Sequence, residues 1–127
     1  MKQIGKLALA VLAGFTLGAG GIELVQAQAA KKPAYVVAEP VVTDLPAFQA
    51  YGPRAAESIK AANGHFLARG KPDVKEGAPA AGNIVIIAFD SLDEAEKWYS
   101  TPPYKDLIAE RQKAANTRLY IVEGEPR

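Results

Sequence analysis

After residue 33, segments with the pattern of a β-strand alternate along the chain with segments in which apolar residues have the spacing of a helix. Runs rich in β-branched residues and bounded by Pro, Gly or Asn predict strands at residues 34–42, 65–69, 83–89 and 118–124, with a short strand at 74–77. Apolar residues spaced three and four apart predict helices over residues 45–62, 91–100 and 104–115. The chain therefore predicts a mixed α and β domain.

Helix boundaries carry their own residue signals. Asp44 before Leu45-Pro46 predicts a helix start, and Asn63-Gly64 predicts its end. Pro53 has no N–H to donate to the carbonyl of Gln49, so we expect a kink or a restart there. Ser91 with Glu94 forms a capping-box pattern, in which each side chain satisfies a free backbone donor, and the buried stripe that follows is expected to contain Leu92, Ala95 and Trp98.

The order of these elements predicts an α+β, ferredoxin-like βαββαβ fold. Its helices cover one face of the sheet. The run Ile84–Phe89 is apolar on both faces, however, which is typical of a strand covered on both sides. A second copy of the chain is the simplest cover for the other face, so we expect a homodimer.

The first 29 residues are typical of a cleavable signal peptide. Lys2 and Lys6 precede an apolar run too short to span a membrane, and Ala27-Gln28-Ala29 matches signal-peptidase spacing. We expect cleavage after Ala29 or, alternatively, after Ala27, and export across the inner membrane to the periplasm. Residues 30–127 would then form a single domain.

Composition narrows the function classes of that domain. Removal of residues 1–29 leaves 13 basic and 13 acidic residues, so we expect no nucleic-acid partner and, after cleavage, no membrane partner. The chain has no cysteine and one histidine, which cannot build a thiolate or histidine-rich metal centre. We predict no metal and no cofactor.

Strand alternation selects the first candidate residues. His65, Leu67 and Arg69 would share the face opposite Phe66, whose bulk suits the helix side. Glu39 on the first strand would look the same way. One interpretation is a polar cavity in which Arg69 binds an anion while His65 or Glu39, both weak catalytic candidates, transfers a proton. The other is an ion pair of Glu39 and Arg69 that orients an interface.

Three more residues are candidates for ligand binding. Arg111 interrupts the apolar stripe of the last helix, where it pairs with Glu76 or a ligand carboxylate or simply extends its head group to solvent. Glu76 precedes Gly77 near the end of the sheet. Tyr35 can add a hydroxyl to a pocket, whereas the helical spacing of Trp98 places it in the core.

Many ordered segments also give the chain a family likeness. It resembles the family called domain of unknown function 1330, of the dimeric α/β-barrel group. The resemblance implies a dimer with a pocket beside each sheet and implies no established reaction. The segments that carry it are Ala34–Val37, Thr43–Phe48 with Tyr51, Asn63–Gly70, Val74–Gly77, Ile84–Ala95, Trp98-Tyr99, Pro103-Tyr104, Arg111 and Val122–Gly124.

We therefore expect an exported homodimer that binds a small, anionic organic molecule through Arg69, Glu76, Arg111 and Tyr35. Two alternatives stay open. One is a cofactor-independent enzyme resembling the monooxygenases or isomerases of this fold group, and the other is a structural dimer without a ligand.

Overall fold

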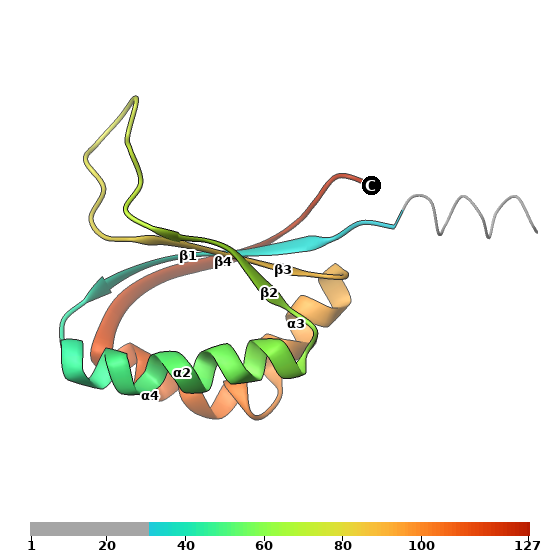
Figure 1. Cartoon of the computed structure of the whole chain (residues 1–127), viewed down its shortest axis with the longest axis horizontal. Coiled ribbons are helices and arrows are strands. Elements are labelled where there is room, and N and C mark those ends of the chain that lie inside the picture. Colours follow the sequence, from blue (N-terminus) through green and yellow to red (C-terminus); the bar gives the residue numbers. More distant parts are fainter. Residues whose placement is uncertain (1–30) are drawn as a thin grey trace, which may run out of the picture. The chain divides into compact units, whose positions relative to one another are not determined.

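The structure, a computed structural model, describes residues 31–127. Residues Lys32–Glu125 form one compact unit, in which a four-stranded antiparallel sheet carries three helices on one face (Figure 1). The predicted signal peptide lies outside the described residues. The elements are β1 (Ala34–Val42), α2 (Leu45–Ala61), β2 (His65–Gly70), β3 (Ile84–Phe89), α3 (Leu92–Ser100), α4 (Tyr104–Ala114) and β4 (Ala115–Glu123).

The predicted α+β, ferredoxin-like class is confirmed by this topology. The strand order is β2-β3-β1-β4, and every neighbouring pair is antiparallel. β1 occupies a central position, and its burial alternates: Ala34, Val36, Ala38 and Pro40 are buried under the helices, while the residues between them are half-buried. This two-residue period is the expected signature of a strand with one face in the core.

Helix α2 runs without a restart through Pro53, where we expected a kink or a new start. The preceding residue explains this continuity. A side chain before proline usually clashes with the proline ring in a helical conformation, and Gly52 has no Cβ to do so. The N-terminus is capped as predicted, because the Asp44 carboxylate accepts from the Ala47 N–H at 3.1 Å.

The C-terminus of α2 is closed by a Schellman motif. The N–H of Asn63 donates to the Lys60 carbonyl at 3.0 Å, and that of Gly64 donates to the Ile59 carbonyl at 2.9 Å. Asn63 adopts the left-handed conformation with φ 61°. Gly64 is required for a different reason, since a Cβ there would lie 2.6 Å from the Phe89 ring.

The second helical segment also begins as predicted. The Glu94 N–H donates to the Ser91 hydroxyl at 3.1 Å, which is one half of the capping box. Ala95 and Trp98 are buried, but Leu92, which we expected in the same stripe, is 37% exposed. After α4, strand β4 begins at once at Ala115.

Two predictions for the second strand and its loop are wrong. Residues 74–77 form no strand and belong to a loop that extends from the sheet away from the helices (Figure 1). Strand β2 contains a bulge, because Phe66 pairs with Ile87 while Ala68 pairs with Ile86, which leaves Leu67 unpaired. The extra residue reverses the alternation beyond it, so Arg69 lies on the helix face and not beside His65 on the other face.

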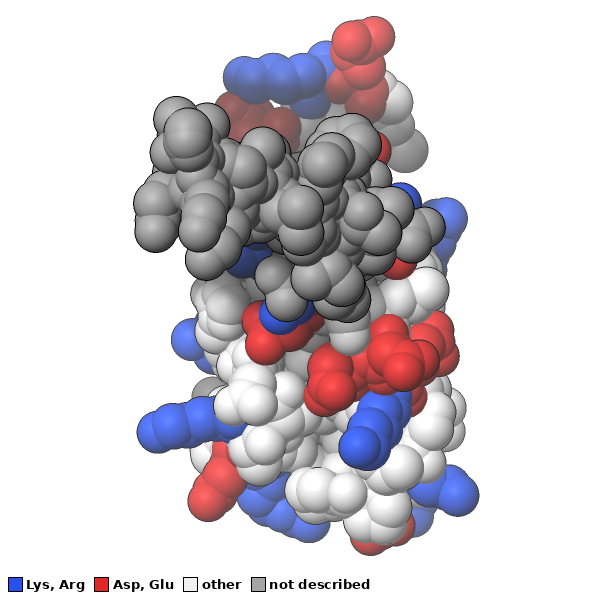
Figure 2. All heavy atoms as spheres, turned by 90° about the vertical axis from the view of Figure 1, so that its right-hand side faces the viewer, with Lys and Arg blue, Asp and Glu red and all other residues white. Residues whose placement is uncertain are grey.

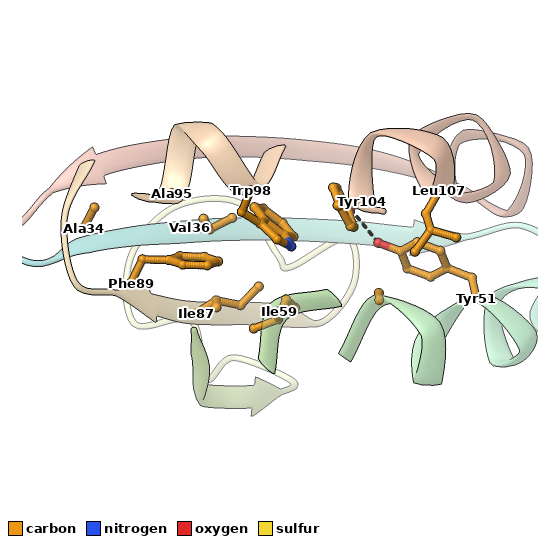
Figure 3. Close-up of a cluster of buried hydrophobic side chains, with 11 residues drawn as sticks. Ala34, Val36, Tyr51, Ile59, Ile87, Phe89, Ala95, Trp98, Tyr104 and Leu107 are labelled. Atoms are coloured by element: carbon orange, nitrogen blue, oxygen red, sulfur yellow. Dashed lines mark hydrogen bonds between the residues drawn. The ribbon is translucent and has the colours of Figure 1, made fainter. Parts of the chain in front are cut away.

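The densest part of the core lies between β1, β3 and α3 (Figure 3). Val36, Ile87 and Phe89 project from the sheet, and the Trp98 ring packs on Phe89 with centroids 5.2 Å apart. Ala95, with no exposed surface, lets α3 approach the sheet closely.

The opposite face of the sheet is open in the single chain. Tyr120 and Val122 of β4 are 41% and 50% exposed, and Leu67 in the β2 bulge is 54% exposed. Figure 2 views one end of the domain and not the open face, and it shows charges of both signs among uncharged residues on the part that the grey atoms leave visible. No helix among residues 31–127 is long and apolar enough to cross a membrane.

Candidate ligand-binding site

A cavity of about 140 Å³ lies between the sheet and the helices, beyond the dense part of the core. Its floor includes one row across the sheet, in which Arg69 pairs with Val85, Val85 with Ala38, and Ala38 with Leu119. Gly52 and Ala55 face this row from α2. Small residues in both layers, Ala38 in the sheet and Gly52 and Ala55 in α2, contribute to this space. The lining consists of Ala38, Pro40, Phe48, Tyr51, Gly52, Ala55, Ile59, Phe66, Arg69, Val85, Ile87, Trp98, Tyr104, Arg111, Thr117 and Leu119.

Arg111 is the charged group buried in this cavity wall, with 6% of its surface exposed. Its Nη1 donates to the Tyr104 hydroxyl at 2.8 Å, and its buried Nε–H has no partner among the described residues. Burial lowers the pKa of Arg111, but interactions with Tyr104, Tyr99 and Tyr51 raise it by more. The guanidinium is therefore a fixed cation, and no residue lining the cavity is a carboxylate.

The two tyrosines beside Arg111 form a hydrogen-bonded pair. Their hydroxyl oxygens are 2.6 Å apart, and Figure 3 shows the contact between α2 and α4. Burial, followed by the charge and hydrogen bond of Tyr104, raises the pKa of Tyr51 far above its ordinary value, although Arg111 acts in the opposite direction. The Tyr51 hydroxyl therefore keeps its proton at any physiological pH.

Trp98 holds the inner wall of the cavity in place. Its ring stacks on Tyr104 with centroids 4.0 Å apart. Its indole N–H donates to the Ser58 hydroxyl at 3.2 Å, and that hydroxyl donates to the Ala55 carbonyl at 2.7 Å. Trp98 is therefore core, as predicted, and it is also part of the lining.

Arg69 provides a second cation at the exposed side of the cavity. The carbon at the centre of its guanidinium lies 4.0 Å from the centre of the Phe66 ring, within the range of a cation–π contact. The side chain belongs to the exposed edge strand of the sheet, whereas Arg111 is buried. Positive charge thus lies at two places around an otherwise uncharged lining.

The structure brings together two of the residues predicted to bind a ligand and separates the others. Arg69 and Arg111 line the cavity. Tyr35 and His65 both pair with Ala88 and lie on the open face of the sheet. Glu76 is exposed in the loop, and no ion pair joins it to Arg111 among residues 31–127.

Glu39 also lies on the open face, where its carboxylate accepts from the Tyr120 hydroxyl at 3.3 Å. The interpretation that Glu39 and Arg69 meet is wrong, because the β2 bulge turns Arg69 to the helix side. The side chains of Glu39 and His65 accordingly lie across the sheet from the cavity. Whether either of them is catalytic stays a prediction.

Two polar lining residues, Tyr51 and Thr117, were missing from the sequence-based candidates, and Tyr104 was expected only as one of several tyrosines that can add a hydroxyl to a pocket. Tyr104 lies two helical turns before Arg111, a spacing that places both on one face of α4, and this signal was readable. Thr117 carried no signal. Its buried hydroxyl oxygen has no partner in the described part of the chain, and only the pairing of β4 with β1 turns it toward the helices.

A wider groove lies on the open face, with a volume of about 700 Å³. The loop between β2 and β3 forms one side, and Glu39, Val41 and Arg118 form the other. Among residues 31–127 no group of three or more His, Cys, Asp or Glu side chains is placed to hold a metal ion.

Solved structures with this fold include proteins of several kinds. A protein of unknown function from Rhodopseudomonas palustris matches with a TM-score of 0.57 and 17% identity over 85% of this chain and 92% of its own. The cofactor-independent oxygenase SnoaB from Streptomyces nogalater gives 0.53 and 13% over 77% and 97%. A hypothetical Arabidopsis thaliana protein gives 0.56 and 11% over 80% and 95%. These similarities establish the ferredoxin-like α+β fold.

The sequence itself identifies the family. The profile described as "Domain of unknown function (DUF1330)" matches residues 33–125, which include every strand and helix described above. The chain belongs to this family, and the resemblance inferred from the sequence is confirmed. No curated protein matches the chain.

Proposed function

We propose that this protein binds a small, anionic organic molecule in the cavity between its sheet and its helices. The observation that carries the proposal is the buried Arg111 guanidinium, which lines the cavity and has, among residues 31–127, no partner for its Nε–H and no carboxylate beside it. A buried, unpaired charge is costly to a fold. A ligand anion would supply the missing partner.

Binding without turnover agrees better with the lining than proton-transfer catalysis does. The alternative of a cofactor-independent enzyme draws support from the fold shared with SnoaB. Proton abstraction in the cavity would need a base, however, and the lining includes neither a carboxylate nor a histidine. The Tyr51 hydroxyl is too weak an acid to act as a phenolate.

Thermal-shift measurements with a library of small organic acids test this proposal. We expect hits that raise the melting temperature of the wild type and fail with Arg111→Met, with a smaller loss for Arg69→Ala. Arg54→Met is the matched control, because Arg54 is an exposed arginine paired with Glu110 and does not line the cavity. If no acid raises the melting temperature of the wild type, the proposal is wrong and the alternative of a structural dimer without a ligand is favoured. If the acids raise the melting temperature of Arg111→Met equally, the proposed site is wrong.

We also propose that the open face of the sheet is covered by a second copy of the chain after export. Exposed Tyr120 and Val122, together with the half-buried Ile86, support this proposal, since a large apolar area is seldom left in water. Sedimentation at micromolar concentration should give a dimer that Val122→Lys weakens, and a monomeric wild type would contradict the dimer. Amino-terminal sequencing of the exported protein tests cleavage after Ala29 or Ala27.

A further inference from the structure

The cavity wall holds polar groups that have no hydrogen-bond partner among residues 31–127. Arg111 makes one hydrogen bond within the described residues, from Nη1 to the Tyr104 hydroxyl, and its buried Nε–H is left without a partner. The buried Thr117 hydroxyl likewise has none. Thr117 belongs to β4 and Arg111 to α4, so these donors line the same cavity from both layers of the domain.

The tyrosine pair adds one more donor by simple counting. Tyr51 and Tyr104 carry two hydroxyl protons, and the single contact between their oxygens uses one of them. The oxygen of Tyr104 also accepts from Arg111. Whichever hydroxyl donates within the pair, one O–H is left without an acceptor among the described residues. A ligand that suits this wall must accept several hydrogen bonds and carry negative charge, and a carboxylate does both.

The remaining lining limits the body of the ligand. Five aromatic rings surround the space, those of Phe48, Tyr51, Phe66, Trp98 and Tyr104. The volume is about 140 Å³, and an apolar cavity of about 150 Å³ admits benzene. The space therefore holds one ring and not two, between faces and edges that favour another aromatic ring.

From these observations we infer that the ligand is an aromatic monocarboxylate of one ring, whose carboxylate accepts from Arg111 and Thr117. The inference rests on the proposed function and narrows it to one chemical class. Arg111 supplies the charge, Thr117 and the tyrosine pair supply neutral donors, and Trp98 and Phe66 supply ring contacts. Arg69 lies at the exposed side, where a substituent of the ring would emerge.

Fluorescence titration of the purified protein with benzoate is the direct test. Trp98 is the only tryptophan in the chain and lines the cavity, so occupancy should change its emission in a saturable way. We expect Arg111→Met to weaken benzoate binding about ten- to hundredfold and Thr117→Val about threefold. Arg111→Lys, which keeps the charge but not the planar fork, should lie between Arg111→Met and wild type. Arg54→Met should bind benzoate as wild type does.

Four comparison ligands separate the possible outcomes. Toluene tests the need for charge, acetate the need for a ring, cyclohexanecarboxylate the need for aromaticity, and 2-naphthoate the size limit. We expect benzoate to bind at least about tenfold more tightly than toluene or acetate, and more tightly than the other two. Near-ultraviolet circular dichroism checks that each variant keeps its packed core.

The results also separate failure of this inference from failure of the proposed function. If acetate or cyclohexanecarboxylate binds as tightly as benzoate and loses affinity in Arg111→Met, the aromatic assignment is wrong while organic-anion binding stands. If toluene binds as tightly as benzoate, or if no acid binds, both are wrong. In the latter case water alone satisfies the free donors.

Discussion

At both ends of the core the helices lie on the sheet, but one end is filled by large side chains and the other contains a cavity. At one end Val36, Ile87 and Phe89 fill the space under α3. At the other end the sheet offers Ala38, α2 offers Gly52 and Ala55, and a cavity is left between them. The difference lies in side-chain size and not in the arrangement of the elements. A cavity can therefore form within an ordinary hydrophobic core where small side chains occupy a few of the inward-facing positions.

We expect core substitutions to cost the most stability at the packed end. Phe89→Ala should lower the free energy of unfolding by about 3–5 kcal/mol, because Phe89 is 1% exposed and packs on Trp98. Urea unfolding followed by circular dichroism measures this. A loss below about 1 kcal/mol would mean that this end relaxes around the gap and is not the rigid part of the domain.

Adding carbon atoms should cost more stability at the packed end than at the cavity end. Gly64→Ala places a Cβ 2.6 Å from the Phe89 ring and should cost about 1–3 kcal/mol. Ala38→Val adds two methyl groups over the cavity floor and should change stability by less than about 1 kcal/mol, while it reduces the space for a ligand. Urea unfolding of both variants tests the contrast. Equal losses would show that the cavity end is as tightly constrained as the packed end.

The sequence was sufficient to predict the helices and the strands of the sheet because their signals are local, but it also predicted a strand at residues 74–77 that does not form. Asp44 and Ser91 identify helix starts, Asn63-Gly64 identifies a helix end, and runs such as Ile84–Phe89 identify strands. Helix α2 shows the limit of a local rule, since Pro53 predicted a kink or a restart and the helix continues through it without a restart. Leu92 shows another, because helical spacing alone does not decide which edge of an apolar stripe meets the sheet.

The site was only partly predictable because it depends on pairing between distant segments. Arg111 was found since a charged residue interrupts an apolar stripe. Arg69 was assigned to the wrong face, because the bulge at Leu67 becomes visible only in the register of β2 against β3. The cavity itself depends on Ala38 of β1 and Ala55 of α2 lining the same space, and no sequence period predicts that.

Arg111 makes the two ends differ in polarity as well as in packing, and its removal should stabilise the protein without ligand. Arg111→Met takes a desolvated cation with a free Nε–H out of the core and keeps most of its volume. We expect the free energy of unfolding to rise by about 1–2 kcal/mol in a ligand-free sample, as when a site is relieved of its functional strain. Urea unfolding measures the change, with Arg54→Met as the surface control. A loss of stability would show that Arg111 is mainly a structural residue.

The smallest effect concerns alkaline pH. The pKa of Tyr51 is raised in the folded protein, so between the ordinary tyrosine pKa of about 10 and the folded value the unfolded chain loses a proton that the folded chain keeps. Above about pH 10 this difference stabilises the unfolded state, and the stability contributed by Tyr51 is lost as the pH rises. From pH 10 to pH 11 the wild type should lose about 1 kcal/mol more than Tyr51→Phe, which has no phenol to ionise at this position. Other tyrosines and the lysines titrate in both proteins, so the difference between the two urea-unfolding curves isolates Tyr51. If the stabilities of the two proteins fall in parallel with pH, the Tyr51 hydroxyl is in contact with water, and the cavity end is as hydrated as the surface.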